Sequence, residues 1–156
     1  MASSIDALDR KILRVLQQDA TLGLDEIAAQ VGSSKTPVWN RIRKLREAGV
    51  IERQVAILDP HKLDLASCFF VLIRTSHHDA EWLAQFTTAL RARPEIMEAH
   101  RLAGEIDYLL KVRVENAGAY DRFYRSLIED VSIFSVTALL SMEETVAKTA
   151  LPIAEG

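Results

Sequence analysis

GSSKTPVWNRIRKLREAGVI, residues 32–51, has the pattern of a short helix with one narrow apolar seam and one basic face. Val38, Ile42 and Leu45 recur at i, i+4 and i+7, the spacing of a helix that packs on its neighbours along one side. A serine precedes this run, a proline falls in its first turn and a glycine follows it, as helix start and stop signals require. The stretch therefore predicts a helix over residues 34–48.

The side of this helix away from the seam combines hydrogen-bond donors, an aromatic ring and positive charge. A projection at about 100° per residue turns outward Thr36, Trp39, Asn40, Arg43 and Lys44, and places Lys35, Arg41 and Arg46 on the flanks. Five of the nine basic residues in positions 1–58 lie between positions 35 and 46. A net charge of −3 for the whole chain therefore hides a local basic patch suited to a polyanion.

Two further helices are expected before the basic one. Asp6 is placed to cap the first, which should end near Asp19, and the second should run over residues 24–31 and stop at Gly32. Three short helices, with a glycine in the connection before the third, match the helix-turn-helix arrangement. The final helix of this arrangement enters the major groove of DNA.

The rest of the chain alternates strand and helix patterns. Residues 50–58 read as a strand, interpreted as the wing of the helix-turn-helix and the start of a linker. The expected elements after it are strand 67–75, helix 80–92, strand 96–103, strand 106–115, helix 117–130 and strand 133–146. This βαββαβ order is that of the ferredoxin-like unit. We therefore predict an α+β protein with a winged helix-turn-helix domain (1–52), a wing strand and linker (53–65) and a ferredoxin-like domain (66–156).

The first strand of the second domain is apolar on both faces. Phe69, Val71 and Ile73 would lie on one face, and Cys68, Phe70 and Leu72 on the other, while both helices of this topology cover only one side of the sheet. Such a surface is expected to be buried against a second copy of the chain. A two-fold dimer would hold two reading helices about one DNA turn apart, roughly 34–36 Å, and select a pseudo-palindromic site.

Three segments of the ferredoxin-like topology should meet at one end of the sheet: the end of the first strand, the turn Ala103–Asp107 and the start of the last strand. Gly104 would let backbone N–H groups approach a carboxylate, and Glu105 and Asp107 could receive an ammonium group. These are the charges of an α-amino acid, although an ordinary hairpin connection would use the same glycine.

Composition limits the remaining classes. The chain has 49% hydrophobic and 26% charged residues, no apolar run long enough for a membrane helix and no signal peptide, so a cytoplasmic protein is expected. Cys68 is the only cysteine, which excludes an intrachain disulfide and a cysteine metal cluster. His77 and His78 suggest a metal site, but no further ligands accompany them, and we predict neither metal nor cofactor.

Motifs along the whole chain resemble the Lrp/AsnC family, the leucine-responsive or feast/famine regulators of bacterial transcription. They are Leu8–Leu13, the pattern S-x-T-P-x-x-x-R-I-x-x-L-x-x-x-G-V-I over residues 34–51, Leu58–Pro60, the A-G-E-I-D turn followed by Tyr108–Leu110, and Thr149–Pro152. The resemblance implies DNA binding, homodimers that assemble into tetramers or octamers, and an amino-acid effector bound between dimers near the turn. Ile106 and Gly23 depart from the family pattern, which often has an aromatic and a serine-type cap there.

Residues 75–82 resemble the branch that controls cysteine catabolism, which points to cysteine or a related thiol amino acid as effector. The predicted DNA-binding residues are Ser33, Ser34, Lys35, Thr36, Pro37, Trp39, Asn40, Arg41, Arg43 and Lys44. The predicted effector-binding residues are Ala103, Gly104, Glu105, Ile106, Asp107 and Thr137. Arg43 and Asn40 would read bases, and the other cations would hold phosphates. For Arg41 a packing role is an alternative to DNA contact, and for Trp39 packing beside the apolar seam is an alternative.

Two other functions fit parts of the pattern. A small ferredoxin-like enzyme could use His100, Glu105 and Asp107, although the chain lacks a nucleophile elbow, a P-loop or a zinc-protease motif, and we predict no catalysis. An adaptor could use the helical domain to bind protein rather than DNA.

Overall fold

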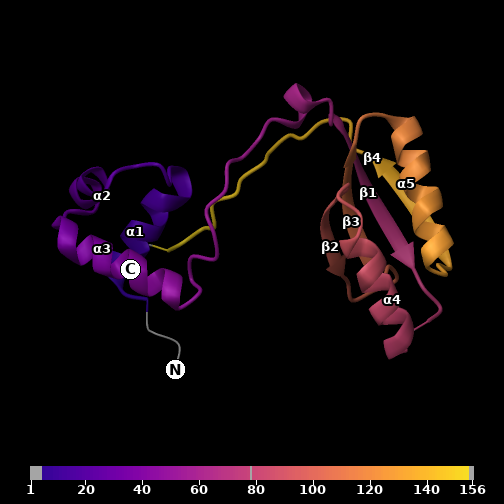
Figure 1. Cartoon of the computed structure of the whole chain (residues 1–156), viewed down its shortest axis with the longest axis horizontal. Coiled ribbons are helices and arrows are strands. Elements are labelled where there is room, and N and C mark those ends of the chain that lie inside the picture. Colours follow the sequence, from indigo (N-terminus) through magenta and orange to yellow (C-terminus); the bar gives the residue numbers. More distant parts are fainter. Residues whose placement is uncertain (1–4, 78, 155–156) are drawn as a thin grey trace. The chain divides into compact units, whose positions relative to one another are not determined.

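The computed structural model describes residues 5–77 and 79–154, which form two compact units (Figure 1). The first contains the described residues up to Ile57 together with those from Thr145 onward, and the second runs from Leu58 to Glu144. The predicted division at 52 and 65 differs mainly because it kept the C-terminal tail with the second domain. Each unit is described by itself.

The first unit is the predicted bundle of three helices: α1 (Ala7–Gln18), α2 (Leu24–Val31) and α3 (Lys35–Glu47). Asp6 and Asp9 form a capping box at the start of α1, because each side chain accepts the backbone N–H of the other. Gly32 ends α2 with φ +68°, a left-handed conformation that glycine adopts without strain. The three helices share one core, in which Ile12 and Val38 are fully buried.

The prediction of a strand over residues 50–58 is wrong. These residues pair with no strand in the part of the chain that the structure describes. Strand identity requires a ladder partner, which apolar alternation alone cannot supply. The C-terminal tail contacts α1 instead: the Gln17 side chain accepts the N–H of Leu151 (2.6 Å) and donates to the Leu151 carbonyl (3.3 Å).

The second unit has the predicted βαββαβ order. It opens with a short 3₁₀ helix, η1 (Pro60–Leu63). The elements that follow are β1 (Ser67–Arg74), α4 (Ala80–Arg91), β2 (Ile96–Arg101), β3 (Tyr108–Val114), α5 (Ala117–Asp130) and β4 (Ser135–Leu140). The strands form one antiparallel sheet in the order β2-β3-β1-β4. The last strand is shorter than the predicted 133–146, since its pairing with β1 ends with the N–H of Ser141 on the carbonyl of Cys68 (2.9 Å).

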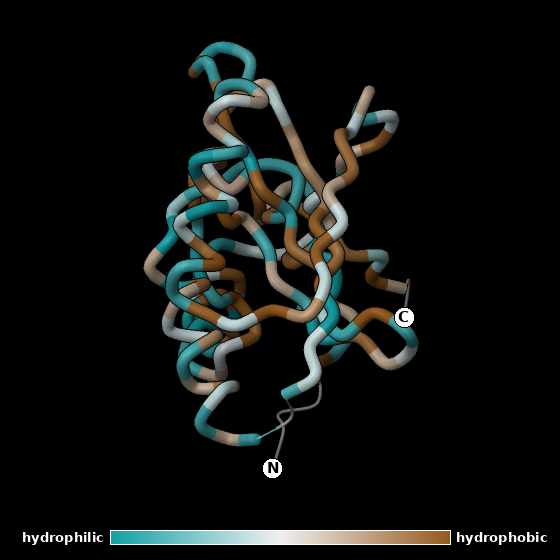
Figure 2. Tube along the Cα trace, turned by 90° about the vertical axis from the view of Figure 1, so that its right-hand side faces the viewer, coloured by the Kyte–Doolittle hydropathy of each residue, from teal (hydrophilic) through white to brown (hydrophobic). Residues whose placement is uncertain are grey.

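Helices α4 and α5 cover the same face of the sheet. Alternate residues of β1 and β3 lie beneath them, and Val71 and Leu110 are fully buried. Phe86 of α4 (1% exposed) and Leu127 of α5 (0%) fill this core. Along the trace, hydrophobic and hydrophilic stretches alternate as one-sided helices require (Figure 2).

The other face of the sheet, which we call the open face, keeps large apolar groups. Phe70 and Leu72 of β1 are half-buried there, and Leu139 of β4, opposite Phe70 in the register, is 50% exposed. The two-sided apolar character predicted for β1 is therefore present. Within the described residues, no helix has the length and hydropathy needed to span a membrane.

Candidate nucleic-acid interface and ligand turn

The seam of α3 fixes which of its side chains reach solvent. Val38, Ile42 and Leu45 are buried, with 0%, 7% and 5% exposure, and Val38 and Ile42 belong to the core shared with α1 and α2. Ser34 occupies the N-cap with extended backbone, and Gly49 follows the helix with φ +71°. Both ends therefore lie where the sequence predicted, and the rotation of the helix is set by apolar packing.

The outer face of α3 presents an aromatic and a guanidinium group together. Trp39 is 47% exposed, so it lies on the surface rather than in the core. The guanidinium carbon of Arg43 lies 4.9 Å from the centre of the Trp39 ring, and its Nε is 3.7 Å from Glu47. A guanidinium group over an indole ring is attracted to the ring face, which restricts the Arg43 side chain. Lys44 is exposed and makes no hydrogen bond or ion pair with any described residue.

Arg41 points back to the start of α1 instead. It donates to the carboxylates of Asp6 and Asp9, and Asp9 is only 6% exposed. The Asp9 N–H and, secondly, Arg41 lower the pKa of Asp6, while the bond to Asp6 raises the pKa of Arg41. The arginine thus neutralises a buried carboxylate at the joint of two helices. A carboxylate pair three residues apart at a helix start indicates the capping box, but no local pattern in the sequence connects it to Arg41.

The remaining predicted DNA contacts surround the first turn of α3. Ser34, Lys35, Thr36 and Pro37 are exposed, and Ser33 is half-buried. Lys35 pairs with Asp25 at 2.8 Å, but both side chains are well exposed, so the pair can exchange for a phosphate at small cost. The side chain of Asn40, which is half-buried, has no hydrogen bond within the described part of the chain.

The turn at residues 103–107, the ligand turn, connects β2 to β3 and is held by backbone contacts. Asp107 donates its N–H to the carbonyl of Ile73 (3.0 Å), and its carboxylate accepts the N–H of Thr75 (2.8 Å). Phe134, just before β4, donates its N–H to the carbonyl of Arg74 (3.1 Å). The three segments expected to meet at this end of the sheet therefore do so.

Within the ligand turn, Gly104 has φ +148°, a conformation that side chains disfavour, and a Cβ placed there would meet no atom within 4 Å. Ala103 and Glu105 are exposed, and Ile106 and Asp107 are half-buried. Thr137 is exposed on the open face, where the register places it opposite Leu72. Asp107 has a supporting contact that the sequence did not reveal, because Thr75 is far from it in the chain.

The groups considered for catalysis do not form a hydrogen-bonded set. The His100 ring lies 3.1 Å from Glu98, whereas Asp107 is engaged by Thr75. The bond to His100 lowers the pKa of Glu98, with burial acting in the opposite direction. His77 stacks on Trp82 with ring centres 6.5 Å apart, and His78 lies outside the described residues. Within the described ranges, no three His, Cys, Asp or Glu side chains are grouped to hold a metal ion.

Two family models match the chain, one on the three helices and one on the second unit and part of the C-terminal tail. The model described as the AsnC-type helix-turn-helix domain matches residues 5–46, and the one described as the Lrp/AsnC ligand-binding domain matches residues 68–151. The first match ends within α3, and the second contains the ligand turn.

Characterised relatives resemble almost the whole chain. It is 42% identical over 150 residues to the DNA-binding transcriptional activator DecR of Escherichia coli (strain K12), with 96% of this chain and 99% of that protein covered. A crystal structure of an AsnC family transcriptional regulator from Agrobacterium tumefaciens superposes with a TM-score of 0.91 at 46% identity, over 94% of this chain and 96% of that one. A transcriptional regulator from Neisseria meningitidis in complex with L-methionine superposes with a TM-score of 0.90 at 27% identity, covering 96% and 97%.

Proposed function

This chain belongs to the Lrp/AsnC family, and on that premise we propose that it regulates transcription by reading DNA with α3 while an amino acid binds at the ligand turn. The similar proteins are named as regulators of transcription and not as enzymes. The observation that carries the proposal is the outer face of α3, where cations and an aromatic ring remain in solvent on a helix that its seam holds in place.

The contacts divide the predicted DNA-binding residues into three roles. Arg43, whose guanidinium group lies over Trp39, and Asn40, whose amide is uncommitted, are suited to base edges, because arginine matches guanine and asparagine matches adenine. Lys35 and Lys44 are suited to phosphates. Arg41 acts through Asp6 and Asp9 to fix α3 against α1, which is a positioning role.

A salt titration of DNA binding tests the proposal. With two to three phosphates neutralised per reading helix and two helices per site, the slope of log K against log [salt] should be roughly −4 to −5. Fluorescence anisotropy with a duplex selected from a random pool, at several salt concentrations, would measure this slope. An adaptor or a catalyst without DNA affinity would give no anisotropy change at any salt concentration.

The proposal includes assembly through the open face. Register rows Leu109–Leu72–Thr137 and Lys111–Phe70–Leu139 place apolar groups in the middle of a sheet whose other face is covered by helices. A second copy of the same surface would remove these side chains from water, and two-fold pairing makes the patch complementary to itself. Further assembly of dimers into tetramers or octamers follows the family resemblance.

The assembly can be tested by placing one charge on the open face. Phe70→Asp should convert the protein to monomers in sedimentation velocity, because an unpaired carboxylate would enter the buried interface. Ile128→Asp is the matched control, since Ile128 is 43% exposed on α5. Equal particle sizes for wild type and Phe70→Asp would reject this interface.

The effector proposal assigns Ala103, Gly104, Glu105, Ile106, Asp107 and Thr137 to an amino acid. A thermal-shift screen of the twenty amino acids, with cysteine and related thiols included, would identify the ligand. Binding should stabilise the folded protein by RT ln(1 + [L]/Kd), and the midpoint of thermal unfolding should rise accordingly. If no amino acid moved the midpoint or altered DNA affinity, the sensing function would be refuted while DNA binding stood.

A further inference from the structure

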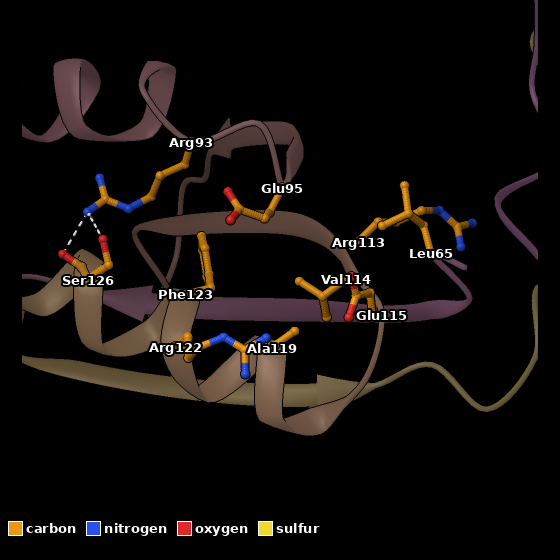
Figure 3. A pocket seen from close by; sticks show the side chains of 10 residues that line it. All are labelled: Leu65, Arg93, Glu95, Arg113, Val114, Glu115, Ala119, Arg122, Phe123 and Ser126. Atoms are coloured by element: carbon orange, nitrogen blue, oxygen red, sulfur yellow. Dashed lines mark hydrogen bonds between the residues drawn. The ribbon is translucent and has the colours of Figure 1, made fainter. Parts of the chain in front are cut away.

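A hollow lies in the second unit, at the end of the sheet away from the ligand turn (Figure 3). It holds about 300 Å³ and lies where β3 ends and α5 begins. Along β3, the six steps from Tyr108 to Val114 span roughly 20 Å at about 3.3 Å each. The hollow is therefore separate from the residues proposed for the effector.

Its wall contains a buried arginine whose hydrogen bonding is incomplete. Arg93 is 8% exposed and donates to the Ala89 carbonyl (2.7 Å), the Ser126 carbonyl (2.6 Å) and Asp130 (2.6 Å). Its Nε nevertheless has no partner among the described atoms. Buried donors are nearly always satisfied, so a residue that lines the hollow has an unpaired donor and lacks an acceptor.

Two further charged side chains of the hollow are uncommitted, whereas Arg113 pairs with Glu144 (3.1 Å). The side chains of Glu95, just before β2, and Arg122, on α5, form no hydrogen bond or ion pair with the described residues, although the Glu95 carbonyl accepts the N–H of Arg113 (2.9 Å). In Figure 3, Glu95 reaches in from one side and Arg122 from the other, with the Phe123 ring between them in this view. Phe123 and Val114, 4% and 3% exposed, give the hollow an apolar floor.

We infer that this hollow is a second site for a small zwitterion, an α-amino acid, independent of the ligand turn. Glu95 receives the ammonium group, Arg122 receives the carboxylate with the Nε of Arg93 as a second donor, and the ligand side chain lies on Phe123. A carboxylate and a guanidinium on opposite sides of an apolar floor match the charge order of an amino acid. The volume is at the lower end of the range for ligand sites, which suits a molecule of this size.

Isothermal titration calorimetry of the full chain with L-alanine, L-leucine, L-methionine and L-glutamate tests the inference. Glu95→Gln and Arg122→Gln should each weaken one binding event at least tenfold for the amino acid that binds, because each removes one charged contact. Arg125→Gln is the control, because Arg125 lies one turn further along α5, is 72% exposed and pairs with Asp121. The N-acetyl derivative of that amino acid, which lacks the ammonium group, should not show this binding event. The decarboxylated amine, which lacks the carboxylate, should not show it either.

A second background separates this site from the proposed effector site. In Gly104→Val the event assigned to Glu95 and Arg122 should persist, whereas the event at the ligand turn should disappear. If Glu95→Gln and Arg122→Gln titrate like the wild type with all four amino acids, or if none of the four binds outside the ligand turn, the second site is disproved. If Gly104→Val titrates like the wild type, it is the ligand-turn proposal that fails.

Discussion

The outer face of α3 and the ligand turn are built in different ways. On α3, the interacting groups are long side chains in solvent, and the seam of Val38 and Ile42 only sets their direction. At the ligand turn, main-chain N–H groups and the Asp107 carboxylate hold distant segments together, and Gly104 has a φ that side chains disfavour. DNA binding by α3 should therefore be sensitive to substitution of single side chains on its outer face. Function of the ligand turn should be sensitive to substitutions that change its backbone conformation.

The largest expected effect is on α3. Arg43→Ala should weaken specific DNA binding by about 1–3 kcal/mol, or roughly 5- to 150-fold, because a bidentate contact to guanine is lost. Anisotropy with the selected duplex and a scrambled one should show the selected duplex losing more. Sedimentation should give an unchanged particle, and unchanged affinity for the selected duplex would show that Arg43 does not read bases.

At the ligand turn, the backbone change should matter most. Gly104→Val places a branched side chain at φ +148°, so the turn must rearrange even though space is free around it. We expect the variant to fold and to bind DNA, while the effect of the amino acid on DNA affinity, typically about 5- to 150-fold in such linkage, disappears. Calorimetry that still shows wild-type effector binding would contradict a backbone-built site.

Sequence periodicity predicted α3 and its exposed face because both depend on neighbours three or four residues apart. The two ends of α3 were predicted from local signals of the same kind, Ser34 and Gly49, and so was the order of the βαββαβ elements. Contacts between distant residues were not predictable in this way. The tie of Arg41 to Asp9, the support of Asp107 by Thr75 and the missing ladder partner of residues 50–58 each depend on the tertiary fold.

Arg41 provides a sharper test, because it lies on the basic helix but behaves like a supporting residue. Arg41→Ala leaves Asp9, 6% exposed, without its cation, so the three-helix unit should lose stability. Lys44→Ala, which removes a cation with no described partner, should weaken DNA binding without this loss. Urea unfolding followed by circular dichroism would compare them, and equal midpoints for the two variants would exclude the positioning role.

Acid should act on the same joint. The Asp9 N–H, together with Arg41, holds the pKa of Asp6 below its usual 3.8 in the folded chain. The stability that this carboxylate contributes is therefore complete above about pH 3.8 and is lost as the pH falls through the lowered pKa. Asp6→Asn keeps a capping side chain, so its urea midpoint should fall less between pH 5 and pH 3 than that of the wild type. Equal falls of the urea midpoint in the wild type and Asp6→Asn between pH 5 and pH 3 would contradict this role of Asp6.

The smallest expected effect compares two glycines of the three-helix unit. Gly23 begins α2 with φ −67°, and its helix start has no side-chain cap, so Gly23→Ser should stabilise the unit by a few tenths of a kcal/mol, up to about 0.5. A Cβ there would lie 3.4 Å from Glu26, an ordinary contact. Gly49→Ser should do the reverse and cost about 1 kcal/mol or more, because Gly49 has φ +71°. Thermal unfolding should therefore move in opposite directions for the same substitution, and a shift of equal sign would show that backbone angle does not govern these two positions.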